Sequence, residues 1–431
     1  MLSQAQAGLT IEITEGLADA IPIAVVPFKW MGGTELPKDK QVAEIVKADL
    51  ARSGLFSPIK TADMLARPYT QQQIRFKNWR MLETPNLVIG QVSPGENGLY
   101  VIEFRLFDVY RQKQITGFRW KEKPSQLRKI AHKISDIIYK ELTGVKGAFN
   151  TQIVYIKKFP NKTDKPYRLY LSDSDGFNEY EMIRHNHPLF SPTWSPDNKK
   201  LAFAMAGSHG QGIFTFDVEI GKQPRRLTKR SMKASAPSWS PDGKQMAMQV
   251  LSNGSSDIYT MDINTKKTKR ITKHWGIDTE PRWSPDGSRI IFTSERGGSP
   301  QLYQYTFSDK KIKRLTFKGK QNLRASFSPD GKMITFVHLR RNNGYNIAVM
   351  DLKTKEMHVI ADSLSGESEH ESPSFAPNGS MVIYAANYTL KGRKGKKTGL
   401  VAASVNGGVR QQYVDEGIGE VREPAWSAFL D

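Results

Sequence analysis

The 431-residue sequence contains no cysteine, which excludes disulfide bonds and thiolate metal ligands. It also has no apolar run near the roughly 18 residues that a membrane-spanning helix requires. The G-x-S-x-G, Walker A, G-x-G-x-x-G and H-E-x-x-H motifs are missing as well. These absences argue against a serine hydrolase of the α/β-hydrolase type, a nucleotide-binding enzyme and a zinc protease. The lack of cysteine suits an oxidising compartment, where an unpaired thiol would be a liability.

Basic residues outnumber acidic residues. Lysine and arginine total 63 against 43 aspartates and glutamates, which gives a net charge of +20. Such an excess raises nucleic acid as a partner. The basic residues are spread along the chain, however, and the densest run, Lys391 to Lys397, is broken by glycine and contains no aromatic residue. We interpret this run as a solvated loop and predict no nucleic-acid partner.

The N-terminal residues have the features of a processed secretion signal followed by a strand. Ala5 and Ala7 have the A-x-A spacing that signal peptidase reads, although a basic n-region and an apolar h-region are missing. We predict that residues 1–7 are a signal-peptide remnant; a chance pair of alanines is the alternative. Leu9, Ile11 and Ile13 then alternate with polar residues. This pattern predicts a partner-binding strand that adds to another protein's sheet edge, with an ordinary edge strand of the small domain as the alternative.

An aromatic residue followed by Ser-Pro-Asp-Gly, or by a close variant, recurs in the C-terminal two thirds of the chain. The intervals are 44 to 51 residues, and the aromatic residues are Trp194, Trp239, Trp283, Phe327, Phe375 and Trp426. Serine opens a type I turn, proline presets φ, and glycine takes the left-handed position that follows. Each motif therefore predicts a hairpin. A strand-rich repeat of this length predicts a β-propeller with one four-stranded blade per repeat.

The repeats do not begin and end at blade boundaries. The last motif supplies a first strand with nothing after it, whereas residues 152–185 supply a second, third and fourth strand with no first. We therefore predict a six-bladed β-propeller over residues 149–431, in which the C-terminal strand completes the blade that begins near residue 152.

Residues 8–148 lack the repeat and predict a small α/β domain. Apolar spacing predicts a helix over residues 38–54 that stops at Gly54, and a weaker helix over residues 70–83. A longer helix is expected from Ser125, as its N-cap, to Gly144. The predicted fold class is an α+β N-terminal domain followed by an all-β six-bladed β-propeller.

The loops that enter the six first strands should gather at one mouth of the ring, and their charges are unevenly distributed. Acidic residues precede the third, fifth and sixth motifs: Asp278, Glu280, Glu367, Glu369, Glu371, Glu416, Glu420 and Glu423. Basic residues precede the second and fourth motifs: Lys229, Arg230, Lys233, Lys318, Lys320 and Arg324. We interpret this as a mouth with acidic and basic sectors that orients a polypeptide ligand. The alternative is that loops are polar everywhere.

Two short patterns contain metal-ligand residue types. His185 and His187 have no third ligand at useful spacing, and the acidic stretch Ser172 to Gly176 lacks the distal glutamate of a calcium loop at its proper position. Both are interpreted as loops or turns. We predict no catalytic residue, no cofactor and no metal site, and leave open only a cation such as calcium in the central channel.

Several stretches together resemble the TolB family, the periplasmic propellers of the Tol-Pal cell-envelope system of Gram-negative bacteria. The stretches are IPIAVVPFKW, KADLARSGLF, ELTGVKGAF, YRLYLSDSDGFNEY, PLFSPTWSPD, TEPRWSPDG and APNGSMVIYAA. The resemblance runs from about residue 8 to the C-terminus. It is specific because ELTGVKGAF and IAVVPFKW lie outside the propeller, whereas WSPDG repeats occur in many propellers.

The resemblance implies a non-enzymatic periplasmic adaptor. Members of the family bind the lipoprotein Pal at the propeller mouth and TolA through the extreme N-terminal segment, and support outer-membrane integrity and constriction during cell division. Carried over by motif, Ala236, Thr279 and Glu280 lie in Pal-facing loops. Residues 233–235 read Lys-Ala-Ser where many relatives have His-Asn-Gly, so a contact made by that histidine does not carry over.

The candidate partner-binding residues follow from the charges at the mouth, the resemblance and the N-terminal pattern. They are Lys233, Ala236, Thr279, Glu280, Arg324, Glu371 and Glu423 at the mouth, and Leu9, Ile11 and Ile13 in the N-terminal segment. Other Tol and outer-membrane proteins remain open as partners. Two alternatives from other classes are the propeller domain of a peptidase-like enzyme that lacks its catalytic domain, and a nucleic-acid binder favoured only by net charge.

Overall fold

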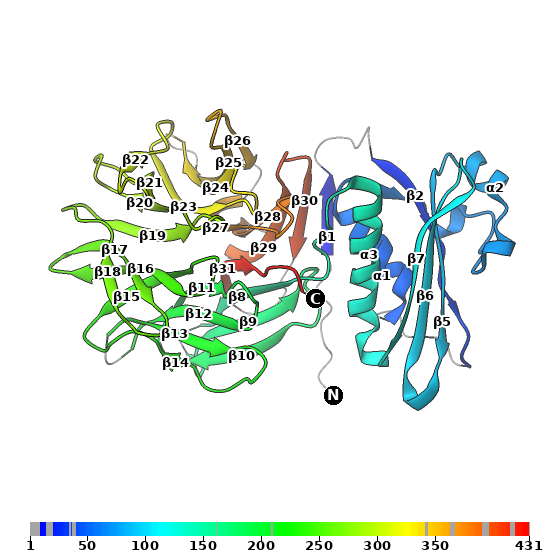
Figure 1. The fold of residues 1–431 in the computed structure, drawn as a ribbon, viewed down its shortest axis with the longest axis horizontal. Coiled ribbons are helices and arrows are strands. Elements are labelled where there is room, and N and C mark those ends of the chain that lie inside the picture. Colours follow the sequence, from blue (N-terminus) through cyan, green and yellow to red (C-terminus); the bar gives the residue numbers. More distant parts are fainter. Residues whose placement is uncertain are drawn as a thin grey trace. The chain divides into compact units, whose positions relative to one another are not determined.

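The computed structural model of the chain contains two units (Figure 1). It describes residues 9–13, 20–33, 36, 40–160, 162–207, 210–340, 344–362, 367–389, 396–413 and 419–430. One unit is Ile13–Asn150, and the other combines Met1–Glu12 with Thr151–Asp431. The small domain was expected to begin at residue 8, whereas the structure groups the described residues 9–12 with the propeller. The expected signal remnant, residues 1–7, and Glu416 lie outside the described residues.

The small unit is built on a mixed sheet with strand order β4-β2-β5-β6-β7, and β3 pairs with β5. The strands are β2 (Ile21–Val25), β3 (Lys29–Trp30), β4 (Phe56–Pro58), β5 (Asn86–Pro94), β6 (Tyr100–Asp108) and β7 (Lys113–Glu122). The helices are α1 (Val42–Arg52), α2 (Phe76–Met81) and α3 (Leu127–Thr143), with short 3-10 helices η2 (Thr61–Asp63), η3 (Gln71–Gln73), η4 (Glu96–Gly98) and η5 (Pro124–Gln126).

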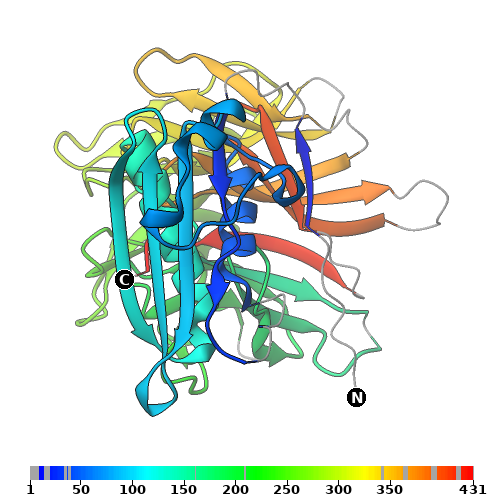
Figure 2. The ribbon, with the colours of Figure 1, turned by 90° about the vertical axis from the view of Figure 1, so that its right-hand side faces the viewer.

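Alternation along the strands gives this sheet two buried faces. Ile23 and Val25 of β2 belong to the core that packs on α1 and α3, whereas Ala24 of the same strand belongs to a second core with Trp79 of α2. The helices α1 and α3 lie side by side on one face of the sheet (Figures 1 and 2). The expected α/β organisation of this region is thus present.

The predicted helix ends are partly right. Gly144 follows α3 in the left-handed conformation with φ of 78°, as expected of a terminating glycine. The prediction that Ser125 is the N-cap of this helix is wrong, because Pro124 first opens the 3-10 helix η5 and α3 starts at Leu127 without a side-chain cap. The weaker helix predicted over residues 70–83 forms only as η3 and the six-residue α2.

The second unit is a six-bladed propeller, as predicted. One blade combines β31 (Glu420–Trp426) with β8 (Gln152–Lys158), β9 (Tyr167–Asp173) and β10 (Tyr180–His185). The second blade contains β11 (Leu189–Trp194), β12 (Lys200–Met205), β13 (Gly212–Asp217) and β14 (Arg225–Arg226). The third blade contains β15 (Lys233–Trp239), β16 (Gln245–Ser252), β17 (Ser255–Asp262) and β18 (Thr268–Arg270). The fourth blade contains β19 (Asp278–Trp283), β20 (Arg289–Ser294), β21 (Gln301–Thr306) and β22 (Ile312–Arg314). The last two are β23 (Gln321–Phe327), β24 (Met333–Leu339), β25 (Tyr345–Asp351) and β26 (Met357–Ala361); and β27 (Glu367–Phe375), β28 (Met381–Thr389), β29 (Lys396–Ser404) and β30 (Val409–Tyr413).

The C-terminal strand completes a blade whose other strands come from the start of the propeller. β31 pairs antiparallel with β8, with Glu420 opposite Lys158 and Trp426 opposite Ile153. β31 covers the edge of β8 that would otherwise be open, which removes a site for edge-to-edge association.

The Ser-Pro-Asp-Gly motifs form the turns that their residues predict. Gly287 has φ of 70°, and the corresponding glycines of the other motifs are also left-handed. Ser284 Oγ donates to Asp286 Oδ1 over 2.5 Å and accepts a hydrogen bond from Arg289 N at 3.0 Å. The serine therefore ties the turn to the start of the second strand, which explains why serine opens nearly every copy.

The last blade differs from the others in having a fifth strand. β1 (Leu9–Ile13) pairs with β30, so that the sheet order is β1-β30-β29-β28-β27 (Figure 2). The N-terminal segment is therefore an edge strand, but of the propeller and not of the small domain as the alternative interpretation supposed. Among the described residues, none of the helices has the length and apolar character needed to cross a membrane.

Candidate partner-binding site at the propeller mouth

Each inner strand of the propeller contains one non-glycine residue with a positive φ. The six residues have φ between 48° and 55° and are Ser191, Ala236, Glu280, Arg324, Ser372 and Glu423. Each lies at a register shift in its strand, such as the one between Thr279 and Arg282, and each directly precedes proline or, after Arg324, alanine. A left-handed non-glycine residue costs about 1–2 kcal/mol, and a bulge redirects its side chain. We call these six residues the bulge ring.

Most of the bulge ring lines one cavity in the centre of the propeller. Ser191, Glu280, Arg324, Ser372 and Glu423 all face a cavity of about 260 Å³. Arg282 also lines this cavity, together with residues of the first strands of neighbouring blades. Five of the six blades thus each direct one bulge residue towards a shared polar centre, whereas Ala236 of β15 does not line the cavity.

Arg324 is the hub of the interactions in this cavity. Its Nε lies 3.0 Å from Glu280 Oε1, and its Nη1 lies 3.5 Å from Glu423 Oε1 and 3.6 Å from Glu371 Oε2. Nη1 also donates to Ser372 Oγ over 2.6 Å. One guanidinium therefore contacts side chains from three other inner strands, β19, β27 and β31. Burial by itself lowers the pKa of Arg324, but the three carboxylates outweigh this effect and raise its pKa above the ordinary value.

The carboxylates of the ring also accept hydrogen bonds from the backbone. Glu280 Oε2 accepts hydrogen bonds from Arg324 N at 3.1 Å and from Thr293 Oγ1 at 2.9 Å. Glu423 accepts a hydrogen bond from Ser191 N in the adjacent blade. These contacts join neighbouring inner strands, so that the bulge ring is fixed by bonds between blades.

Arg282 is the second cation of the cavity. Its Nη1 donates to Pro281 O at 3.1 Å and to Pro237 O at 3.4 Å. Burial lowers the pKa of Arg282, although the charges of Glu280 and Glu423 act in the opposite direction. Because an arginine stays protonated in proteins, this side chain adds a permanent positive charge to the cavity.

The seven candidate partner-binding residues at the mouth all lie on inner strands, but their environments differ. Lys233 is exposed at the start of β15, whereas Ala236 is buried within the bulge ring. Thr279 Oγ1 donates to Gln249 Oε1 over 2.6 Å, which links β19 to the preceding blade. Leu9, Ile11 and Ile13 are placed only as residues of the strand β1, since their side chains lie outside the described part of the structure.

The acidic sector proposed from the sequence is neutralised within the propeller. Glu280, Glu371 and Glu423 are paired with Arg324, buried Asp278 pairs with Arg296 at 2.8 Å, and Glu420 pairs with Lys158 at 3.7 Å. The side chains of Glu367 and Glu369 lie outside the described residues. By contrast, the basic residues Lys229, Arg230, Lys233, Lys318 and Lys320 are exposed, and within the described ranges no ion pair involves them. The described mouth therefore presents a positively charged rim around a neutralised centre.

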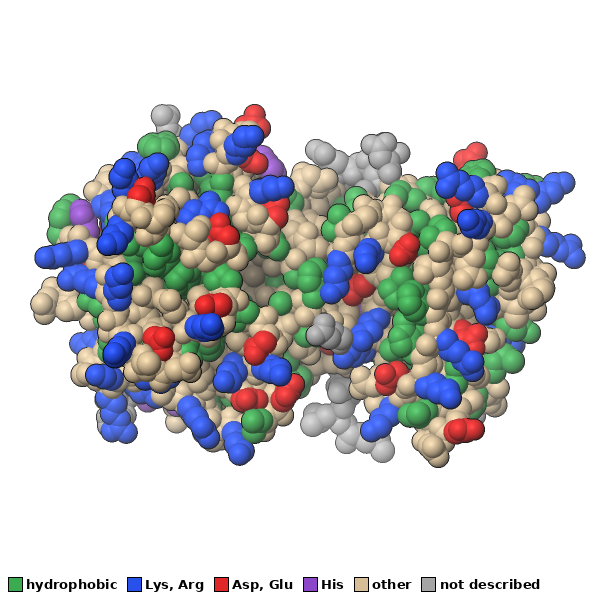
Figure 3. Space-filling view, in the orientation of Figure 1, with side chains coloured by type: hydrophobic (Ala, Val, Ile, Leu, Met, Phe, Trp, Pro, Cys, Tyr) green, Lys and Arg blue, Asp and Glu red, His purple; other side chains and the backbone are tan. Residues whose placement is uncertain are grey.

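Basic side chains are not confined to the mouth. On the face shown in Figure 3, lysine and arginine residues are distributed over both units and do not form one continuous patch. The dense run Lys391 to Lys397 lies mostly outside the described residues, and only its last two residues enter β29. The visible surface thus agrees with the diffuse charge expected from the sequence.

The residues considered as metal ligands are engaged in local structure. His185 Nδ1 accepts a hydrogen bond from His187 N at 3.0 Å, which forms a tight turn after β10. Gly176, in the acidic stretch, has φ of 84° and closes the turn after β9. In the cavity, the guanidinium of Arg324 occupies the space among the carboxylates that a cation such as calcium would need.

Sequence reasoning missed Ser191, Ser372 and Arg282. The first two occupy the same repeat position as Glu280, directly before the proline of the inner strand. Aligning the six motifs would have put these residues at one repeat position, before proline in five motifs and before Ala325 in the fourth, but would not have indicated their positive φ. Arg282 directly follows Pro281, and no sequence pattern marked it as a residue of the cavity.

Comparison with known proteins identifies the family. The TolB beta propeller domain model matches residues 139–430, and the TolB amino-terminal domain model matches residues 9–115. The chain is 49% identical over 429 residues to the Tol-Pal system protein TolB of Thioalkalivibrio sulfidiphilus, covering 99% of this chain and 95% of the relative. The chain belongs to the TolB family.

Other TolB proteins support this assignment at the level of sequence and of structure. The Tol-Pal system protein TolB of Hydrogenovibrio crunogenus is 45% identical over 426 residues, covering 98% of this chain and 95% of the relative. The crystal structure of TolB from Acinetobacter baumannii is 36% identical and superimposes with a TM-score of 0.86, covering 98% of this chain and 100% of that one. The resemblance and the fold class inferred from the sequence are thus confirmed.

Proposed function

We propose that the protein is a non-enzymatic periplasmic adaptor of the Tol-Pal system. In this proposal the propeller mouth binds the lipoprotein Pal, the N-terminal segment binds TolA, and the protein supports outer-membrane integrity and constriction during cell division. Support comes from the relatives, which are named Tol-Pal system proteins and match over 95% of their own length. The alternative of a propeller that has lost a peptidase domain gains no support from these relatives.

The observation that carries the proposal is the construction of the mouth. Its central groups are joined between blades by Arg324 and Glu280, whereas its exposed lysines have no ion pair in the described structure. A rigid centre lowers the entropic cost of docking, and unpaired charges at the rim accelerate encounter with an oppositely charged partner. These are properties of a protein-binding surface. Ser195 of the cavity donates to the Asp197 carboxylate at 2.6 Å, but this pair is the Ser-Pro-Asp turn bond that recurs in the other motifs, as between Ser240 and Asp242.

The proposed TolA contact is supported by the position of the N-terminal strand. β1 is the fifth strand of its blade, whereas the other blades have four, so the blade architecture does not require it. Its outer edge is the end of that sheet, and backbone groups at such an edge can pair with a strand of another protein. We expect removal of residues 8–14 to abolish TolA binding while thermal stability and Pal binding stay nearly unchanged. A large fall in melting temperature would instead assign β1 a purely structural role.

Glu280→Ala tests Pal binding at the mouth. If Glu280 meets a donor of Pal, the substitution should weaken binding by about 2–5 kcal/mol, mainly through faster dissociation. Because Glu280 also accepts hydrogen bonds from Thr293 and from Arg324 N, Thr293→Val is the matched control. Thr293→Val removes the hydrogen bond that buried Thr293 donates to the Glu280 carboxylate and leaves that carboxylate in place.

The two variants separate an interface role from a structural one. Affinity for the periplasmic domain of Pal, measured by calorimetry, should fall for Glu280→Ala and stay near the wild-type value for Thr293→Val. Equal affinity of Glu280→Ala and wild type would remove Glu280 from the interface. A wild-type protein that failed to bind the domain at all would refute the proposed function.

A further inference from the structure

Two aromatic side chains at the propeller mouth are exposed to solvent. Trp275 is 78% exposed and Phe317 is 74% exposed, which makes them the two most exposed of the large apolar residues in the described structure. Trp275 lies in the loop that leads into β19, and Phe317 lies in the loop that leads into β23. Large exposed aromatic side chains are unfavourable in water and are frequent energetic anchors of protein interfaces.

The two loops belong to one continuous surface. The hairpin between β20 and β21 lies between them, because Glu295 N donates to Ile277 O at 3.0 Å on one side and Asn322 N donates to Pro300 O at 2.9 Å on the other. The strands that follow, β19 and β23, contain Glu280 and Arg324, whose ion pair closes the centre of the mouth. Trp275 precedes Glu280 by five residues, of which only the last three belong to β19, so the two lie at most about 17 Å apart along the chain. The aromatic pair therefore lies on the rim of the proposed Pal site.

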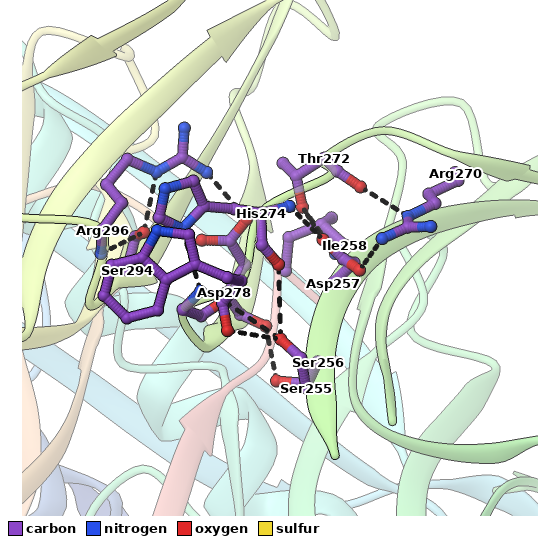
Figure 4. Close-up of polar contacts among 12 residues, drawn as sticks. Ser255, Ser256, Asp257, Ile258, Arg270, Thr272, His274, Asp278, Ser294 and Arg296 are labelled. Atoms are coloured by element: carbon purple, nitrogen blue, oxygen red, sulfur yellow. Dashed lines mark hydrogen bonds and ion pairs between the residues drawn. The ribbon is translucent and has the colours of Figure 1, made fainter. Parts of the chain in front are cut away.

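The loop of Trp275 is held in place by a polar network (Figure 4). Ser255 Oγ lies within hydrogen-bond distance of His274 O, Trp275 O and Gly276 O, at 3.4, 3.1 and 3.3 Å. His274 N donates to Asp257 Oδ1 at 3.1 Å, and Ser256 Oγ donates to Asp278 O at 3.1 Å. The backbone on both sides of Trp275 is thus anchored to β17, while its indole stays in solvent.

Phe317 is fixed in a different way. The guanidinium of Arg314 lies 5.1 Å from the centre of its ring, and Arg314 Nε donates to Thr316 O at 2.7 Å. A cation above the ring restricts its orientation without burying it. Both aromatic residues are therefore presented in defined positions, which reduces the conformational entropy lost on binding.

The charge around the aromatic pair indicates the chemistry of the occupant. Lys273, Lys318 and Lys320 flank the two residues and are exposed, and within the described ranges no ion pair involves them. The nearby acids Asp278 and Glu280 are neutralised by Arg296 and Arg324, and Glu295 in the hairpin between the loops offsets only part of the charge of the three lysines. A complementary partner would have an apolar pocket surrounded by carboxylates.

We propose that Trp275 and Phe317 are the anchor residues of the propeller mouth, and that they insert into an apolar, acid-rimmed surface of the Pal domain. This inference rests on the proposed function, since Pal is the occupant to which it commits. It adds two anchor residues to the mouth, Trp275 in the loop between β18 and β19 and Phe317 in the loop between β22 and β23. The lysines at the rim act mainly on the rate of association.

The test compares wild type with Trp275→Ala, Phe317→Ala and the double variant. Affinity for the soluble periplasmic domain of Pal from the same bacterium is measured by calorimetry and by surface-immobilised kinetics. Each single variant should weaken binding at least tenfold and the double variant at least a hundredfold, with melting temperatures unchanged because the side chains are exposed. Tyr110→Ala, which removes a 56% exposed aromatic residue from the small unit, is the matched control and should bind like wild type.

Two further variants test the mechanism. Ser255→Ala releases the loop but keeps Trp275, so it should weaken binding about two- to fivefold, less than loss of the indole. Replacement of Lys273, Lys318 and Lys320 by glutamine should slow association and flatten its dependence on salt. If wild type binds Pal while the double variant binds within twofold of it, the anchor assignment is overturned and Pal docking stands. If wild type does not bind, the proposed function fails, and the occupant proposed here fails with it.

Discussion

Trp426 Nε1 donates a hydrogen bond to Thr151 Oγ1 over 2.8 Å, which joins the end of the propeller sequence to its beginning. Ser427 strengthens this closure, since Ser427 N donates to Gln152 O at 2.9 Å and Gln152 N donates to Ser427 Oγ at 3.0 Å. The ring is therefore closed by side-chain and backbone bonds as well as by the pairing of β31 with β8. Trp426 itself is partly buried, against the core of the first and last blades.

Deletion of residues 423–431 should destabilise the propeller by several kcal/mol. The deletion removes most of β31, leaves the edge of β8 unpaired at Ile153 and Val154, and takes away the contacts of Trp426 with the last blade. It also removes Glu423 from the ion pairs of Arg324. The melting temperature, measured by calorimetry, should fall by clearly more than that of a control in which only Leu430 and Asp431 are removed. A truncated protein with the same melting temperature as the full chain would refute closure of the propeller by β31.

The propeller could be predicted from the sequence because the blades repeat the same type of turn at a nearly constant interval. The bulge ring could not be predicted in the same way, because Ala236, Glu280 and Arg324 share a backbone conformation and no side-chain property. The pairing of β1 with β30 joins segments that are far apart in sequence, and local alternation indicates a strand without naming its neighbour. Trp275 and Phe317 gave no pattern because exposure depends on the tertiary fold.

Replacing Asp286 should alter both the stability of one Ser-Pro-Asp-Gly turn and its pH dependence. The hydroxyl of Ser284, together with Ser288 N at 3.0 Å and Ser288 Oγ at 2.8 Å, lowers the pKa of Asp286 to about 2. The pKa of Asp286 is lower in the folded state than in the unfolded state. Its contribution to the stability of the fold is therefore present above about pH 4 and is lost as the pH falls towards 2. Asp286→Ala should cost about 0.5–1 kcal/mol at pH 7, because the carboxylate is largely exposed.

The chain supplies its own reference for this turn. Asn378 holds the same position in its motif and accepts hydrogen bonds from Ser380 N at 3.1 Å and Ser380 Oγ at 2.8 Å. Asp286→Asn should therefore keep most of the stability of the turn at pH 7. In urea unfolding followed from pH 5 to pH 2, the difference between wild type and this variant should shrink with falling pH. A constant difference would show that the charge of Asp286 contributes nothing.

Asp136 should make the small unit less stable as the pH rises from about 4 to about 6. Burial raises the pKa of this carboxyl to about 6, although its oxygens accept hydrogen bonds from Phe149 N at 2.8 Å and Asn150 N at 3.2 Å. The folded state then retains a proton that the unfolded state has released, so stability declines over this window and levels off above it. The shift corresponds to about 3 kcal/mol at most. Asp136→Asn should remove this decline in calorimetric scans, and a decline of equal size in the variant would assign it to other groups.

Arg324→Met should destabilise the propeller more at neutral pH than at pH 5. The substitution leaves Glu280, Glu371 and Glu423 without their shared cation, and these carboxylates converge on one guanidinium at 3.0 to 3.6 Å in the structure. Loss of one partner from a partly buried ion pair leaves uncompensated charge, so we expect a loss of about 1–3 kcal/mol at pH 7.5.

The sign of the pH effect follows from mutual repulsion of these carboxylates. Without Arg324 the three carboxylates repel one another in the folded state, so acidification, which reduces this repulsion, favours the folded state and narrows the stability deficit of the variant. Arg168→Met is the control, because Arg168 Nη1 pairs with the single carboxylate of Glu181 at 3.0 Å outside the ring. Its deficit in urea unfolding should change little between pH 7.5 and pH 5. If Arg324→Met shows the same deficit at both pH values, repulsion among the ring carboxylates is not what Arg324 relieves, and its stabilising effect must come from the hydrogen bond to Ser372 and from packing.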